Sequence, residues 1–350
     1  MCRPSSALFL PKLDSGGPRV PCNLGTIVEL GLGRLVKMPG SVVSLFSESD
    51  EFLAALGDDG VLNLLVTCQG QFRAQLTQVT LHRMRLSAGD EYLSRIAFVA
   101  VPADTLLVTL PLGDRPAPIW AGVEMRVGEM ITFGPAERLH ARSDGPCQWG
   151  AIQLPVDDFV QYGGAMRGAT PIVPAVARWR PPRAALRQLR HLHQAAVRTA
   201  EARSGVLADR EAAHGLEQQV IHALVESLSA RPVYEETAAA RRHRGILASL
   251  EDLLEAEPPP SVTAIGAALG VSQHMLRECC KKNLGLDPSR YRRLRGMQRA
   301  RRALRHESPD TASVSAVARR CGFRDPGRFA VNYRALYGES PSTTLRRLTA

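Results

Sequence analysis

The sequence lacks any apolar run long enough to cross a membrane. A membrane-spanning helix needs about 20 consecutive apolar residues, and no stretch of the 350-residue chain approaches that length. Residues 1–17 also lack the basic region and following apolar core that export signals share. We therefore expect a cytoplasmic protein that has no membrane partner.

Cysteine is scarce, and its spacing fits neither disulfides nor zinc. The seven cysteines, an odd number, are scattered from Cys2 to Cys321, and no two have the CxxC spacing of a metal knuckle. We expect reduced thiols. The neighbours Cys279 and Cys280 raise the alternative of redox sensing, but their place on an expected packed helix favours thiols buried in a core.

Histidine is too sparse in the strand-rich part of the chain to indicate a metal enzyme. Such an enzyme would need a His-x-His pair and a nearby glutamate on adjacent strands, whereas His82 and His140 are isolated from one another. His191 and His193 do form a His-x-His pair, but helical spacing directs the two rings to different faces. We predict no catalytic residue, no metal and no cofactor.

Positive charge is concentrated in the last quarter of the chain. The whole chain has a net charge of +10, while residues 261–350 hold 18 Lys plus Arg against 6 Asp plus Glu. A localised positive field of this size is typical of proteins that bind polyanions. No strongly apolar helical face accompanies it, which favours nucleic acid over membrane. RNA is a further alternative, but the basic region lacks exposed aromatic platforms on which bases could stack.

Residues 62–154 read as short strands of an antiparallel barrel or sandwich. Phe72, Ala74 and Leu76 alternate with polar residues, as expected for a half-buried strand. Turn signals interrupt the strands at residues 88–90, 112–114 and 144–146.

Helices are expected after this strand-rich part. Prolines at positions 171, 174, 181 and 182 indicate a linker. Apolar residues then recur at helical spacing. They are Leu186, Leu189 and Leu192 in one segment and Leu216, Val220, Ile221, Leu224 and Leu228 in the next. These two helices either form a dimer or pack against the barrel, and a third helix over Ile246–Leu254 ends before the triple proline at 258–260.

One pattern occurs twice after the triple proline. The first copy contains Val262, Ile265, Leu269 and Gly270, and the second contains Val314, Val317, Cys321 and Gly322. Further on, Leu276 and Phe329 each stand nine residues before a glycine, and a proline follows that glycine after three more residues. A short helix, a glycine-containing turn and a second helix make a helix-turn-helix unit, and two copies in register are strong support for it.

Three Asp-Pro or Ser-Pro pairs predict helix starts in this region, at Asp287-Pro288, Asp325-Pro326 and Ser340-Pro341. The helix from Pro288 to about His306 would span roughly 28 Å, close to the approximately 34 Å turn of B-DNA. It could therefore hold two reading units in successive major grooves.

Candidate DNA contacts fall into three sets. On the connecting helix, where no acidic residue occurs, a phosphate-facing stripe is expected from Arg292, Arg295, Arg299 and Arg302. On the first reading helix the expected contacts are His274, Arg277, Glu278 and Lys281. On the second they are Arg324, Arg328, Val331 and Arg334, with Asp325 expected to act as a cap.

The C-terminal segment resembles the AraC family of bacterial regulators. The resemblance lies in ALGVSQHMLRECCKKNLGLDPSRYRRLR and VSAVARRCGFRDPGRFAVNYRALYGESP, and the run GRFAVNYRALYGESPSTTLRR is nearest to regulators of the ethanolamine-operon kind. Many members have Arg, Phe and Arg where this chain has Glu278, Cys280 and Val331. The resemblance implies two reading units on a long central helix, an upstream cupin-like barrel, contact with RNA polymerase and often a homodimer.

Together these features predict an α+β protein. We expect a tail at 1–25, a β-rich cupin-like regulatory domain at 26–165, a linker with amphipathic helices at 166–235, and a double helix-turn-helix domain at 236–350. The expected function is that of a regulator of promoter DNA, an activator whose N-terminal domain binds a small-molecule effector. A repressor, an effector-independent regulator and a cupin-type metalloenzyme fused to a DNA-binding domain are the alternatives.

Overall fold

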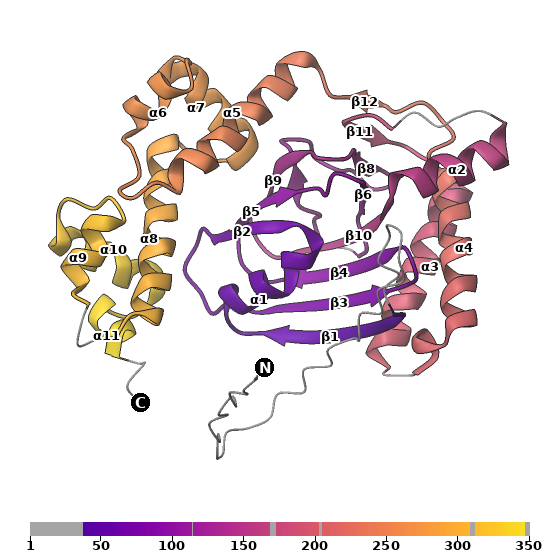
Figure 1. The fold of residues 1–350 in the computed structure, drawn as a ribbon, viewed down its shortest axis with the longest axis horizontal. Coiled ribbons are helices and arrows are strands. Elements are labelled where there is room, and N and C mark those ends of the chain that lie inside the picture. Colours follow the sequence, from indigo (N-terminus) through magenta and orange to yellow (C-terminus); the bar gives the residue numbers. More distant parts are fainter. Residues whose placement is uncertain (1–37, 114, 169–172, 203–204, 309–311, 347–350) are drawn as a thin grey trace, which may run out of the picture. The chain divides into compact units, whose positions relative to one another are not determined.

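The computed structural model describes residues 38–346 except 114, 169–172, 203–204 and 309–311. Within these residues the fold is α+β, with antiparallel sheets in the N-terminal part and helices in the C-terminal part (Figure 1). The fold class expected from the sequence is confirmed. The tail expected at 1–25 lies outside the described residues.

The N-terminal part contains two sheets in which all paired strands are antiparallel. The larger sheet has the order β1 (Gly40–Phe46), β3 (Ala74–Thr80), β4 (Arg85–Glu91), β10 (Cys147–Pro155), β6 (Thr105–Leu110), β8 (Met130–Phe133), β11 (Val176–Trp179), β12 (Tyr234–Glu235). The smaller sheet has the order β2 (Val61–Val66), β5 (Arg95–Ala100), β9 (Arg138–Ser143), β7 (Ile119–Trp120).

An apolar core joins the facing sides of the two sheets. It includes Leu64 from the smaller sheet and Leu76 and Leu107 from the larger one. Helix α1 (Ser49–Leu56), which follows β1, buries Phe52 and Leu56 in the same core. The alternation expected around Leu76 is confirmed, because every second side chain there enters this core.

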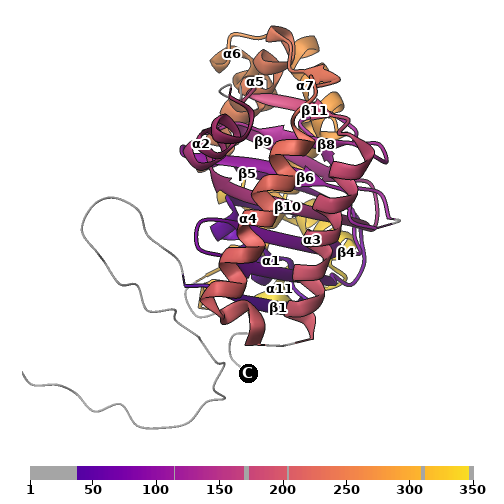
Figure 2. The same cartoon turned by 90° about the vertical axis from the view of Figure 1, so that its right-hand side faces the viewer.

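Helices cover the other face of the larger sheet. Helices α2 (Val156–Arg167), α3 (Arg183–Glu201) and α4 (Arg210–Ser227) share one core with this sheet, in which Leu189 and Leu224 join Val108 and Ile152. Figure 2 shows α3 and α4 lying across the strands. The two apolar stripes are therefore used in packing against the sheet, which was the alternative to a dimer.

The expected linker contains a strand of the large sheet. Strand β11 pairs with β8, and β12 pairs with β11, so residues 166–235 contribute strands as well as helices. The four residues of β11 lie between the prolines, which flank the strand and remove no hydrogen bond from its ladder.

The C-terminal part consists of seven helices among the described residues. They are α5 (Ala238–Leu254), α6 (Val262–Ala268), α7 (Gln273–Leu284), α8 (Pro288–His306), α9 (Val314–Arg320), α10 (Pro326–Tyr337) and α11 (Pro341–Arg346). One core contains residues of α5, α6, α7 and the first half of α8, and a second contains residues of α9, α10, α11 and the second half of α8. Helix α8 therefore belongs to both units (Figure 1).

The expected helix ends are confirmed. The side chains of Asp287 and Asp325 accept hydrogen bonds from the backbone N–H of Ser289 and Arg328, at 2.9 and 3.0 Å. Ser340 Oγ accepts in the same way from Thr343 N–H at 3.1 Å. The glycines that end α7 and α10 have φ values of +70° and +76°, a conformation that glycine adopts without steric cost.

Candidate DNA-binding interface

Each helix-turn-helix unit packs one side of its second helix against the first. Leu276 and Cys280 of α7 are buried in one core with Ile265 of α6, and Phe329 of α10 is buried in another with Val317 of α9. The opposite sides of α7 and α10 remain exposed. This arrangement presents a free helical face on each unit, as groove binding requires.

The four residues expected on the face of α7 are all exposed. They are His274, Arg277, Glu278 and Lys281. Arg277 Nε lies 3.3 Å from an Asp287 carboxylate oxygen, and His274 Nε2 lies 3.7 Å from Glu278 Oε1. Exposed pairs of this kind contribute at most about 1 kcal/mol, so these side chains can exchange partners when a polyanion approaches.

The expected contacts on α10 are also brought together on one exposed surface. Arg328, Val331 and Arg334 lie on the helix, and Arg324 precedes its cap. Val331 is 70% exposed, which is unusual for a valine and gives this face an apolar patch between two arginines. Such a patch can contact the methyl group of thymine in a major groove. For both helices, contact with DNA stays a prediction.

The connecting helix differs from the expected phosphate-facing stripe. Arg295 is only 3% exposed, and its guanidinium lies 3.1 Å from Glu251 and 2.7 Å from Glu255. Arg302 is partly buried and pairs with Asp50 of α1 at 2.8 Å.

Backbone carbonyls satisfy the other two arginines of the expected stripe. Arg292 donates to the carbonyls of Pro259 and Pro260, and Arg299 donates to the carbonyls of Leu254 and Ala256. These bonds hold the chain between α5 and α6. The absence of acids within the helix was misleading because each of the four arginines has a partner outside α8.

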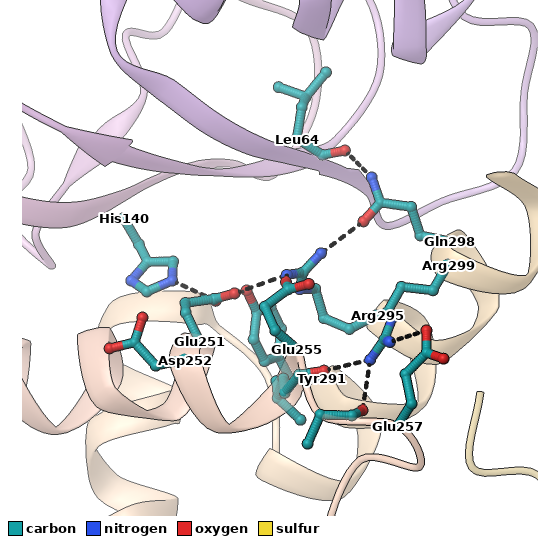
Figure 3. A network of polar contacts seen from close by, with 12 residues as sticks. Leu64, His140, Glu251, Asp252, Glu255, Glu257, Tyr291, Arg295, Gln298 and Arg299 are labelled. Carbon is teal, nitrogen blue, oxygen red and sulfur yellow. Dashed lines mark hydrogen bonds and ion pairs between the residues drawn. The ribbon is translucent and has the colours of Figure 1, made fainter. Parts of the chain in front are cut away.

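A buried polar network surrounds Glu251 of α5 (Figure 3). Its carboxylate, 2% exposed, accepts hydrogen bonds from His140 Nε2 at 2.8 Å and from the Tyr291 hydroxyl, and it pairs with Arg295. Burial alone would raise the pKa of Glu251, but the hydrogen bond from His140 and the charge of Arg295 outweigh it and lower the pKa to about 2. Sequence reasoning missed this network, whose only signal is an acid within a leucine-rich helix.

The structure does not bring together the histidines considered for a metal enzyme. His140 lies in the network of Glu251, whereas His82 contacts the carbonyl of Arg210. His191 is exposed and His193 is buried, where it contacts the carbonyl of Ala151, so the two rings point to different faces as expected.

The adjacent thiols on α7 are core residues. Cys279 and Cys280 are both fully buried in the core of the first unit. Burial raises the pKa of Cys279 to about 11 and that of Cys280 further still. Both thiols therefore stay protonated near neutral pH, which disfavours thiolate chemistry.

Known proteins match the C-terminal part of the chain. Residues 265–347 match the model of a helix-turn-helix domain. The probable thc operon regulatory protein of Rhodococcus erythropolis is 36% identical over 104 residues, which cover 29% of this chain and 31% of that protein. A XylDLEGF operon transcriptional activator of Pseudomonas putida is 38% identical over 77 residues, 22% of this chain and 24% of that protein. The chain thus spans less than a third of these relatives, and the matches support a helix-turn-helix domain in this part of the chain.

Among solved structures, the AraC-like transcriptional activator CuxR is similar at 13% identity and a TM-score of 0.39, covering 69% of this chain and 88% of that one.

Within the part of the chain that the structure describes, no helix has the length and apolar character needed to span a membrane.

Proposed function

We propose that this protein is a transcription regulator that binds double-stranded DNA with both helix-turn-helix units. The observation that carries the proposal is that α7 and α10 each expose a polar face while both units pack on one helix, α8. A shared helix fixes the spacing of the two faces, as reading two successive major grooves requires. The match of residues 265–347 to a helix-turn-helix domain supports the same function.

Within this function, the exposed residues of α7 and α10 contact the bases. Arg277 and Arg328 suit guanine edges, Glu278 can accept a hydrogen bond from cytosine, and Val331 suits a thymine methyl group. The remaining residues of the two faces contact either bases or phosphates, and they are His274, Lys281, Arg324 and Arg334. We do not include Arg292, Arg295, Arg299 and Arg302 of α8, because other groups of the protein hold them.

For the whole protein we propose an activator of promoter DNA in the cytoplasm. The names of the two curated relatives, an operon regulatory protein and an operon activator, support this class of function. A small molecule bound by the N-terminal domain is the proposed signal, and recruitment of RNA polymerase is the proposed output. A homodimer stays a prediction. The apolar stripes of α3 and α4, which suggested it, pack on the larger sheet instead. The likeness to ethanolamine-operon regulators rests on residues 327–347 alone.

The proposal is tested by measuring how the full chain binds nucleic acids of equal length. Fluorescence anisotropy should show binding to duplex DNA that weakens with salt, with a log–log slope of about −5 to −9 if about 6 to 10 phosphates are neutralised. Duplex RNA should bind more weakly, because its deep, narrow major groove excludes a reading helix. Equal binding of both duplexes, or binding that salt does not change, would contradict the proposal.

A further inference from the structure

Two acidic residues at the start of α1 contact the second half of α8. The Glu48 carboxylate lies 3.2 Å from Arg301 and 2.9 Å from Arg305, and the Asp50 carboxylate lies 2.8 Å from Arg302 and 3.7 Å from Arg305. The two acids and the three arginines are only partly buried, with exposed side-chain fractions between 20% and 35%. We call this set of five residues the acidic clamp.

The position of Glu48 indicates that its carboxylate serves this contact. Glu48 is the N-cap residue of α1, yet its side chain caps no backbone N–H of the helix. Asp50 follows in the first turn, where a carboxylate is favoured by the helix dipole. Both acids therefore combine a place at the start of α1 with a contact to arginines more than 250 residues away.

A second group of contacts joins the smaller sheet to the same helices. Leu65 of β2 and Ile96 of β5 are buried in one cluster with Leu294 of α8. Gln298 of α8 donates a hydrogen bond to the carbonyl of Leu64 (Figure 3). The side chains of this group are nearly inaccessible, whereas Glu48, Asp50 and Arg301 of the clamp are partly exposed in an open cleft of about 640 Å³ that Leu65 and Gln298 also line. Water can therefore solvate the carboxylates and guanidinium groups of the clamp once they separate.

The clamp acts on the part of α8 that leads to the second reading unit. Arg301, Arg302 and Arg305 are in the last turns of α8, and the core of the second unit contains Leu304 from the same turns. The reading faces themselves remain exposed. The contact therefore leaves the faces free, but its two carboxylates offset part of the charge of the three arginines and restrain the helix that positions the second unit.

We propose that the acidic clamp lowers the affinity of the full chain for DNA, and that its release raises it. This inference rests on the proposed function. Two carboxylates hold the arginines that would otherwise add to the positive field of the second unit, and they also repel approaching phosphates. Release removes both effects and lets α8 move relative to the sheets. The N-terminal part thereby regulates DNA binding through α1.

The test compares two double variants of the full chain. Glu48→Gln with Asp50→Asn removes the two negative charges of the clamp, and Glu51→Gln with Asp58→Asn is the matched control. Glu51 is exposed on the same helix and Asp58 is 80% exposed with only a 3.5 Å pair to Arg85, so the control removes the same charge without touching α8. Binding is measured by anisotropy on a duplex selected with the unaltered chain.

The clamp variant should bind about 10-fold more tightly than the control, with a salt slope steeper by about 1 to 2 units for the arginines it frees. Equal affinity of the two variants, or weaker binding by the clamp variant, would overturn the clamp while leaving DNA binding intact. Failure of the unaltered chain to bind any duplex would instead overturn the proposed function, and the clamp's role with it. Hydrogen exchange in α8 should also rise in the clamp variant alone, and unchanged exchange would refute the contact itself.

Discussion

Replacing Glu251 by Gln should destabilise the protein by about 3 kcal/mol. The pKa of Glu251 is lowered from 4.5 to about 2 in the folded state. Because one pKa unit corresponds to about 1.4 kcal/mol, the folded structure favours the ionised carboxylate by about 3 kcal/mol. Gln keeps the size and an acceptor oxygen for His140, but it removes the charge opposite the buried Arg295. Breaking a buried ion pair in this way costs about 3 to 5 kcal/mol.

Urea unfolding followed by circular dichroism at pH 7 measures this loss of unfolding free energy. Glu255→Gln is the matched control, since Glu255 pairs with the same arginine but is 66% exposed, and its loss should stay below about 1 kcal/mol. A carboxyl group whose pKa is lower in the folded than in the unfolded state stabilises the fold at pH values above the unfolded pKa. The difference in unfolding free energy between Glu251→Gln and the unaltered protein should therefore narrow as pH falls from about 4.5 toward 2. A loss below about 1 kcal/mol for Glu251→Gln at pH 7 would refute the reasoning.

Burial lowers the pKa of His193 to about 4. As pH falls from 7 to 5, this histidine is protonated in the unfolded chain before it is protonated in the folded one, so the unfolding free energy should fall by about 2 kcal/mol. His193→Gln should lose this pH dependence and the exposed His191→Gln should keep it, as urea titrations at both pH values can show. Gly322→Ala should cost at least about 1 kcal/mol more than Gly270→Ala in thermal unfolding, because both have positive φ but only at Gly322 would a Cβ lie 3.0 Å from a proline ring carbon. The fragment 236–350 should bind duplex DNA at least as tightly as the full chain, because it lacks the acids of the clamp; much weaker binding by a folded fragment in anisotropy would contradict this.

Local features of the C-terminal part could be predicted because nearby residues determine them. Gly270 and Gly322 have positive φ, and Asp287 and Asp325 cap α8 and α10, all within a few residues of the helix ends they define. The repeated pattern also predicted which two helices pack together in each helix-turn-helix unit. These elements therefore followed from spacing and side-chain chemistry alone.

Contacts between distant segments could not be predicted in this way. Arg302 points to Asp50, 252 residues earlier, and Arg295 points to Glu255, 40 residues earlier. A helical wheel shows that the two arginines share one side of α8, but it contains nothing about which acids the fold brings there. Strand β11 was missed for a related reason, since four residues between prolines give too short a pattern to distinguish a strand from a linker.

Selection of binding sites from random duplex DNA tests the central claim most directly. The full chain is compared with Arg277→Ala and Arg328→Ala, and Arg187→Ala on α3 serves as a control because it removes an exposed arginine far from both units in sequence. We expect two short motifs about one helical turn apart. Each reading-face variant should relax one motif at a few base positions, with a cost of about 1 to 3 kcal/mol at the original site, and the control should relax neither. Selected motifs that stay unchanged in both reading-face variants would contradict the claim.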